Sequence, residues 1–397
     1  MRSDPHRMAG GRWRRPLAMV GMLGLVASTP VGAQTTAWSA RERALIDSLS
    51  LEQLGPPPPS PSNVYADDPA AASLGAAIFS DTRFSANGEV SCASCHHADY
   101  GLTDPHPRGR GIGETRRRTM PIAGMAWQRW FFWDGRADSL WSQTLGPLQD
   151  PVEHGLNRVQ VLQLVQDHYA ELYGDVFGPL PTREGDDGSV TQVLVNVGKA
   201  LAAHVRTFLP EETRFDRFAS DLREGNSGDE HLSEPEKRGL RLFLSDARCV
   251  NCHNGPMFSN GEFHHSGTPD DGTPDLGRGG VIAEISSAEF GFFSRWSDAD
   301  PTTDGDHIRF LNAPPHKYER TFKTPSLRGV GTRPPYMHNG IFETLSEVLH
   351  NYRVVSGTPL ADEIFHGELS DRDLADLEAF LMTLSPTFGS NSTVSTE

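Results

Sequence analysis

Apolar residues recur at helical spacing in two long stretches near the middle of the chain. In residues 158–177 and again in residues 191–209, apolar side chains return every three or four positions. This spacing places them on one face and predicts two amphipathic helices. Residues 179–189, between the two, are rich in proline, glycine and aspartate and predict a loop.

Shorter helices are predicted towards both ends of the chain. Ser233 and Glu236 form a capping box with Pro235 in the first turn, and the helix that they open runs to about Leu244. Strand signals are weak, and the glycine- and aspartate-rich residues 259–306 predict a long surface loop. The other predicted helices are residues 39–54, which a proline run at 55–61 interrupts, and residues 69–79, 344–352 and 371–384.

The first 33 residues have the pattern of a secretory signal peptide. Three arginines at positions 12, 14 and 15 precede an apolar run at residues 17–27 and a small-residue site at 31–33. The run is too short to span a bilayer, so cleavage and release into the periplasm are predicted, with no membrane anchor. The net charge of −16 excludes nucleic acid as a partner and is compatible with docking of a small basic protein.

All four cysteines fall in two C-x-x-C-H motifs, Cys92-x-x-Cys95-His96 and Cys249-x-x-Cys252-His253. This is the attachment motif of c-type haem, in which the thiols bond to the porphyrin and the histidine binds the iron. Disulfides would not require a histidine after each pair, and one four-cysteine zinc site would leave both histidines idle. A thioredoxin-like C-x-x-C normally occurs once, so two covalently bound c-type haems are predicted.

Each half of the chain reads as a helix, a haem motif, a long loop and a further helix. The predicted fold is therefore mainly α, with two cytochrome-c-like domains that each bind one haem. The polar residues 221–229 mark the boundary between them. The predicted segments are a signal peptide at 1–33, an N-terminal helix and proline-rich linker at 34–68, an N-terminal domain at 69–225, a C-terminal domain at 226–390 and a tail at 391–397.

From about residue 71 to 385, the chain resembles the bacterial di-haem cytochrome c peroxidases, and more closely their MauG-like branch. The motifs that carry the resemblance are VSCASCHH at 90–97, FWDGR at 132–136, GPL at 146–148, DPVEHG at 150–155, FKTPSLR at 322–328 and PYMHNG at 335–340. The resemblance implies that hydrogen peroxide reacts at the N-terminal haem and that the C-terminal haem stores and relays electrons.

The resemblance also assigns roles to individual residues. His96 and His253 would be the proximal iron ligands, and Glu153 would be the acid that moves a proton between the two peroxide oxygens. Gln143 and Pro147 would line the same distal pocket. Through the FWDGR motif, the resemblance also implies that Trp133 lies between the two haems.

The second axial ligand of the C-terminal haem separates the two branches of the family. Family registration places it fourteen residues beyond His338, at Tyr352, where peroxidases proper have methionine and MauG-like proteins have tyrosine. Met337 is the alternative, because methionine is a common haem ligand. A tyrosine that binds no iron is the third reading.

Four positions depart from the family patterns. Ile112 stands where peroxidases proper have a histidine that plugs the resting site, which implies an open N-terminal iron; the nearest histidine is His106. Thr119 and Arg333 replace the calcium-binding asparagine and its partner threonine, which leaves a bridging calcium in doubt. Ala247 replaces the aromatic relay of the MauG branch.

Three functions are compatible with these features. A periplasmic peroxidase would take electrons from a small c-type cytochrome or cupredoxin, whereas a MauG-like enzyme would oxidise aromatic side chains of a partner protein. The third is a di-haem electron carrier without enzymatic activity. The sequence does not fix the oligomeric state, and the resemblance allows a homodimer.

Overall fold

A computed structural model describes residues 37–182, 185–309, 311, 314–355 and 368–386, so the predicted signal peptide and the tail at 391–397 lie outside the described residues. Within these ranges the fold is mainly α-helical, as predicted, and its one sheet is a pair of two-residue antiparallel strands. In this sheet β1 (Phe263–His264) pairs with β2 (Phe322–Lys323), with Phe263 opposite Lys323. No helix in these ranges is long and apolar enough to cross a membrane.

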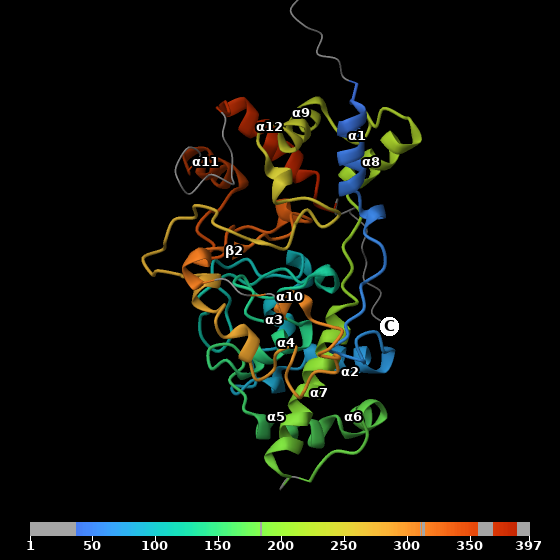
Figure 1. Ribbon diagram of the computed structural model, residues 1–397, viewed down its shortest axis with the longest axis vertical. Helices are drawn as coiled ribbons and strands as arrows, with labels where there is room; N and C mark the ends of the chain where they lie inside the picture. Colours follow the sequence, from blue (N-terminus) through green and yellow to red (C-terminus); the bar gives the residue numbers. More distant parts are fainter. Residues whose placement is uncertain (1–36, 183–184, 310, 312–313, 356–367, 387–397) are drawn as a thin grey trace, which may run out of the picture. The chain divides into compact units, whose positions relative to one another are not determined.

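The helices between residues 69 and 205 pack around α7 (Asp187–Val205), which is buried along most of its length (Figure 1). Its partners are α2 (Pro69–Phe79), α4 (Leu140–Gln149) and α5 (Arg158–His168), while α6 (Ala170–Phe177) packs on α2. The contact between α2 and α7 is close, because a Cβ on Gly75 would lie 2.1 Å from the carbonyl oxygen of Ala200. This group positions the first haem motif, which forms α3 (Cys92–Cys95).

A second group of helices surrounds the other haem motif. In this group α9 (Glu234–Leu244) packs on α12 (Asp371–Met382), and a Cβ on Gly239 would lie only 1.9 Å from the carbonyl oxygen of Asp376. The further members are α1 (Ala40–Leu49) and α8 (Arg214–Glu224), which pack on each other, and α11 (Leu345–Val355), which packs on α12.

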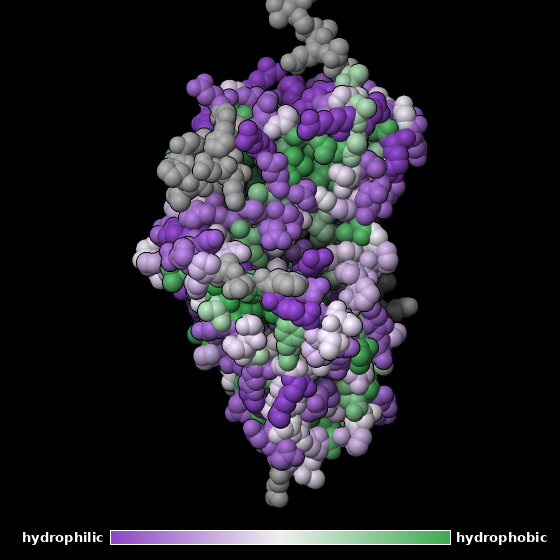
Figure 2. Space-filling model, viewed as in Figure 1, coloured by the Kyte–Doolittle hydropathy of each residue, from purple (hydrophilic) through white to green (hydrophobic). Residues whose placement is uncertain are grey.

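Short helical turns join these groups. They are α10 (Asp306–Arg309) and the single-turn 3₁₀ helices Leu51–Gln53, Thr82–Phe84, Ala98–Tyr100, Met125–Trp127, Cys249–Asn251, Arg278–Gly280, Ile285–Ser287, Pro315–Tyr318 and Val330–Thr332. Hydrophilic residues cover most of the face in Figure 2, in keeping with the high net charge.

Several helix predictions hold and others are corrected. The helix at 69–79 and the capping box of Ser233 and Glu236 are confirmed, whereas the predicted helix at 158–177 is two helices. The break lies at Tyr169, which leaves the helical region at φ −133° while its hydroxyl donates to Asp81 Oδ2 at 2.7 Å. The polar stretch 221–229 was predicted as a boundary, but its first four residues belong to α8.

Candidate active site and haem pockets

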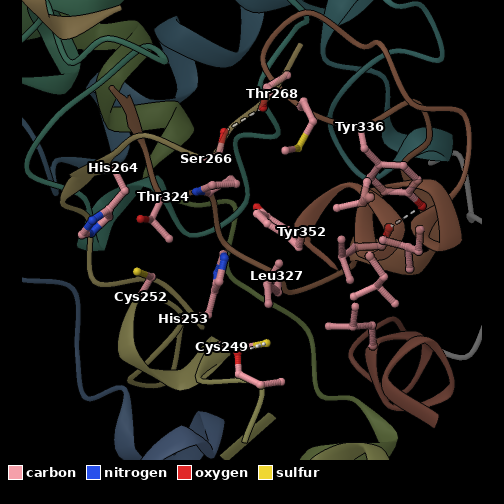
Figure 3. A pocket seen from close by; sticks show the side chains of 18 of the residues that line it. Cys249, Cys252, His253, His264, Ser266, Thr268, Thr324, Leu327, Tyr336 and Tyr352 are labelled. Carbon is pink, nitrogen blue, oxygen red and sulfur yellow. Dashed lines mark hydrogen bonds between the residues drawn. The ribbon is translucent and has the colours of Figure 1, made fainter. Parts of the chain in front are cut away.

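Two large cavities lie beside the two C-x-x-C-H motifs. The first, here called the Tyr352 cavity, is lined by Cys249, Cys252, His253 and Tyr352 and has a volume of about 1420 Å³. Figure 3 shows the His253 imidazole and the Tyr352 phenol projecting into it.

The second, here called the Glu153 cavity, has a volume of about 1790 Å³ and is lined by Cys95, His96, Gln143, Pro147 and Glu153. A smaller adjoining space shares these residues and reaches Cys92. Because the two cysteine pairs line different cavities, one zinc site built from all four cysteines is excluded.

Both histidines are oriented in the same way by a main-chain carbonyl group. His96 Nδ1 lies 3.1 Å from the carbonyl oxygen of Leu102, and His253 Nδ1 lies 2.9 Å from that of Phe258. When Nδ1–H donates to these oxygens, Nε2 keeps its lone pair for a metal. Burial lowers the pKa of His96 and lowers that of His253 to about 4, so both rings are neutral, as iron ligation requires.

The backbone of each motif also suits haem attachment. The amide of His96 donates to Cys92 O at 2.9 Å and that of His253 to Cys249 O at 2.8 Å, so one turn brings both sulfurs and the imidazole together. All four cysteines are free thiols. Burial raises the pKa of Cys92 to about 12 and that of Cys249 to about 12, so both thiols are neutral when nothing is attached to them. The donor set fits two c-type haems.

Glu153 lies on a tight turn that directly follows α4. Its amide donates to Asp150 O at 3.1 Å, and its carbonyl accepts from the amide of Ile112 at 3.0 Å. The turn needs a glycine beside it, because a Cβ on Gly111 would lie 2.5 Å from the Cα of Glu153. The backbone of Glu153 is therefore fixed beside the cavity, and Glu153 lines this cavity together with His96.

The electrostatics of Glu153 are those of an acid–base group. Burial, and then the nearby negative charge of Asp150, raise the pKa of Glu153 to about 7, and Arg136 opposes this change. A carboxyl group with this pKa can both accept and donate a proton near neutral pH.

Gln143 and Pro147 lie one turn apart in α4, and both line the Glu153 cavity. Because proline has no N–H group, Pro147 cannot donate to the carbonyl of Gln143 four residues earlier. The carbonyl of Pro147 in turn accepts the amide of His154 at 3.1 Å, which ties α4 to the turn that carries Glu153.

Trp133 is the single described residue that lines both the Tyr352 cavity and the Glu153 cavity. It is buried, and its Nε1–H donates to the carbonyl of Arg118 at 2.8 Å. Its own carbonyl accepts the amide of Lys323 at 2.7 Å. The turn after it requires Gly135 at φ +66°, because a Cβ there would lie 2.2 Å from Phe263. The indole is thus held between the cavities from both halves of the chain.

Tyr352 and Met337 both line the Tyr352 cavity. Tyr352 lies inside α11, which continues beyond the predicted end at residue 352 to Val355. Burial, together with the neighbouring Cys249 and Cys252, raises the pKa of Tyr352, so the phenol is neutral without a metal. The cavity lining brings both candidate ligands to the site and does not choose between them.

The other departures from the family pattern have clear positions. Ile112 is 39% exposed, and neither it nor His106 lines either cavity. Ala247 is buried and lines the Tyr352 cavity. No described histidine other than His96 lines the Glu153 cavity.

Two features of the site were not predicted from sequence. Lys323 lines the Tyr352 cavity, and its buried Nζ donates to Trp130 O at 2.9 Å; burial lowers the pKa of this lysine to about 7. At the Glu153 cavity, Arg117 pairs with Asp134 at 2.6 Å and with Asp275 at 2.7 Å. The three consecutive arginines at 116–118 in an acidic chain were the available signal for this second feature.

This chain is similar to several known proteins. Residues 69–224 match the family of the di-haem cytochrome c peroxidases. The methylamine utilization protein MauG of Methylorubrum extorquens is 34% identical over 327 residues, which cover 80% of this chain and 78% of MauG. The cytochrome-c peroxidase IdrP1 of Denitromonas iodatirespirans is 31% identical over 386 residues, covering 92% of this chain and 95% of that protein.

Solved structures show the same fold. The di-haem peroxidase BthA of Burkholderia thailandensis superposes with a TM-score of 0.64 at 22% identity, covering 81% of this chain and 87% of BthA. A MauG-like protein associated with microbial copper homeostasis has a TM-score of 0.61 at 24% identity, covering 88% of this chain and 96% of that protein. By these matches, this chain belongs to the di-haem cytochrome c peroxidase and MauG family, whose cofactors are c-type haems with iron, and it is a peroxide-dependent oxidoreductase.

Proposed function

We propose that this protein is a periplasmic di-haem peroxidase that activates hydrogen peroxide in the Glu153 cavity and receives electrons through the Tyr352 cavity. The observation that carries the proposal is the pairing of His96 with Glu153 in one cavity, where the pKa of Glu153 is about 7. An electron carrier without enzymatic activity has no use for such a group.

Cys92, Cys95 and His96 would hold a haem in this cavity, and that haem would supply an iron for peroxide and the electrons that reduce it. The Glu153 carboxylate would accept a proton from one peroxide oxygen and give it to the other. The protonated oxygen would then leave as water when the O–O bond breaks. Gln143 hydrogen-bonds the bound peroxide and Pro147 limits the space around it. Two electrons and two protons in all convert one peroxide to two waters.

In the Tyr352 cavity, Cys249, Cys252 and His253 would hold the second haem, and Tyr352 would be a further protein ligand of its iron. A phenolate oxygen stabilises oxidised iron, so this haem should have a low potential. Trp133 shortens the electron path, because its indole borders both cavities.

Two sources of electrons are compatible with this reaction. A small c-type cytochrome or cupredoxin would donate electrons to a peroxidase, whereas a MauG-like enzyme would take them from aromatic side chains of a partner protein. Tyr352 and the apolar Ile112 favour the second source, while the apolar Ala247 argues against the relay route of the MauG branch. The relatives of this chain include both a MauG protein and a cytochrome-c peroxidase, so both electron sources are retained.

The experiment that tests the proposal is addition of one equivalent of hydrogen peroxide to the fully oxidised holoprotein, followed by haem absorption. An immediate and lasting spectral change supports an open site with oxidation shared between haems, as in the MauG-like alternative. A spectral change that appears only after one-electron reduction indicates a conventional peroxidase. In that case either the open iron inferred from Ile112 or the iron ligation proposed for Tyr352 is wrong. No reaction in either state refutes the proposal and leaves an electron carrier.

Haem attachment and export are tested separately. Haem staining of denatured protein should show covalent haem, and Cys92→Ala and Cys249→Ala should each lower the haem content. Mass spectrometry of protein recovered from the periplasm should find a mature N-terminus near Gln34. A homodimer or monomer is distinguished by its mass in solution.

A further inference from the structure

Arg118 is a buried cation whose contacts join the two halves of the chain. Only 5% of this residue is exposed. On the N-terminal side, Nη1 donates to Thr103 Oγ1 at 3.1 Å and to Thr119 O at 3.0 Å, and Nη2 donates to Asp104 O at 3.1 Å.

The same guanidinium reaches the second half of the chain, more than 200 residues away. Nη2 also donates to the carbonyls of Arg333 and Pro334, each at 3.1 Å. The main-chain amide of Arg118 donates to His338 O at 2.8 Å. Five oxygen atoms, four of them main-chain carbonyls, therefore converge on one positive group.

Carbonyl and hydroxyl oxygens gathered in this way are the ligands that Ca²⁺ prefers, at about 2.3–2.6 Å. Here they already lie within hydrogen-bonding distance of guanidinium nitrogens, so an ion in contact with them would overlap Arg118. The hydroxyl of Thr119 donates to Asp104 Oδ2. The residues present do not fit a bridging calcium ion.

The positive charges at this site also argue against a bound calcium ion. Arg333 is half-buried, and its guanidinium donates to Gly329 O at 3.0 Å and Ser326 O at 3.2 Å. Burial, and then the positive charge of Arg118, lower the pKa of Arg333 to about 10, so the two cations already repel each other. Asp104 is 4% exposed, and its negative charge partly balances that of Arg118. A divalent ion would add further positive charge to this site.

The position of Arg118 connects this site to the electron path. Its carbonyl accepts the indole N–H of Trp133 at 2.8 Å, and Trp133 borders both cavities. The oxygens that hold the guanidinium therefore also determine where the Arg118 carbonyl, and with it the indole, lies.

We propose that the guanidinium of Arg118 is a built-in cation that takes the place of a bridging calcium ion and positions Trp133 between the two cavities. In this arrangement Arg118 joins residues 103–119 to residues 333–334 without a metal. It acts through Trp133 and touches no substrate, so it is a positioning residue. The calcium part of the proposal does not depend on the proposed roles of the two haems.

The first test measures calcium in the wild-type holoprotein. Elemental analysis after dialysis should find far less than one calcium ion per chain. Neither EGTA nor added CaCl₂ should change the melting temperature or the haem spectrum. One calcium ion per chain, removed by EGTA with a fall in melting temperature, would overturn the proposal even if the peroxidase assignment held.

The second test uses Arg118→Ala and adds small cations back. Oxidation should spread from one haem to the other more slowly, on the order of 10-fold or more, because Trp133 loses its fixed position. Guanidinium chloride or CaCl₂ at millimolar concentration should restore a large part of this rate, and MgCl₂ should restore less, because it demands stricter geometry. If the positive charge of Arg118 had no role, none of these added cations would restore the rate.

The control is Arg206→Ala, since Arg206 is also buried, donates to the carbonyl of Pro58 at 3.0 Å and forms an ion pair with Asp67 at 2.8 Å, but lies away from Trp133 in the hydrogen-bond network. It should lower the melting temperature but show no response to added cations. If Arg118→Ala also lowers the melting temperature and shows no response to added cations, the positioning role is refuted. If Arg118→Ala does not fold, Arg118→Lys replaces it. A lysine keeps the charge but cannot reach both sets of oxygens, so an unchanged transfer rate in it would refute the same role.

Discussion

Replacement of Glu153 by glutamine should make the protein more stable and much less reactive. Raising the pKa of this carboxyl from 4.5 to about 7 corresponds to roughly 3 kcal/mol of penalty on its charged form. Glu153 is only partly buried, so solvent screens part of this penalty and we expect about 1–3 kcal/mol. Glutamine keeps the shape of the side chain and removes the charge.

The sign of the stability change depends on pH. Below pH 4.5 the carboxyl is protonated in both the folded and the unfolded chain, so it contributes no penalty. Between pH 4.5 and about 7 the unfolded chain ionises while the folded protein resists, and above that range the penalty is complete. Urea unfolding of the two holoproteins should therefore coincide near pH 4.5 and diverge towards pH 8, with Glu153→Gln the more stable.

Reactivity should change in the opposite direction. Stopped-flow mixing with hydrogen peroxide should show a loss of about 10²- to 10⁴-fold in Glu153→Gln, the usual contribution of a general acid–base group. The wild-type rate should rise with pH and level off above about pH 7, because the carboxylate must first accept a proton. The rate of the glutamine variant should not depend on pH in this range.

Asp150→Asn is the matched variant for this experiment. It removes the neighbouring charge that helps to raise the pKa of Glu153, so the inflection should move to lower pH while most of the activity remains. The reasoning is refuted if Glu153→Gln reacts within a few-fold of wild type, or if it keeps the inflection near pH 7.

Three further substitutions test other parts of the molecule. Tyr352→Phe should alter the low-spin electron paramagnetic resonance signal while Met337→Leu leaves it unchanged, and the reverse result would make Met337 the ligand. Trp133→Phe should retain both haems but slow the transfer of oxidation between them in stopped-flow measurements; an unchanged rate would exclude the indole from the path. Asp216→Asn should lower the free energy of unfolding in urea by about 3–5 kcal/mol at neutral pH, because it leaves Arg328 buried without its partner at 2.9 Å. Burial opposes ionisation of Asp216, but Arg328 lowers its pKa, so this stability should disappear as the pH falls below the ordinary value of 3.8, and a loss under 1 kcal/mol at neutral pH would contradict the argument.

Local signals in the sequence were sufficient where neighbouring residues decide the structure. The capping box of Ser233 and Glu236 fixes the start of α9 through hydrogen bonds within one turn. The break at Tyr169 was not predictable from apolar spacing, which continues through it, because its hydroxyl bonds to Asp81, 88 residues away. The helix α8 was missed because its polar final turn resembles a linker.

The sequence by itself determined the two haem motifs, the mainly helical class and the family, because each depends on residue types at short, fixed spacings. The roles of Glu153, Tyr352 and Trp133 could be named only through resemblance. Tertiary structure decided that Trp133 borders both cavities and that burial raises the pKa of Glu153. It also decided that Arg118 meets the carbonyls of residues 333 and 334. Burial and contacts between distant residues exist only once the chain has folded, and no local pattern encodes them.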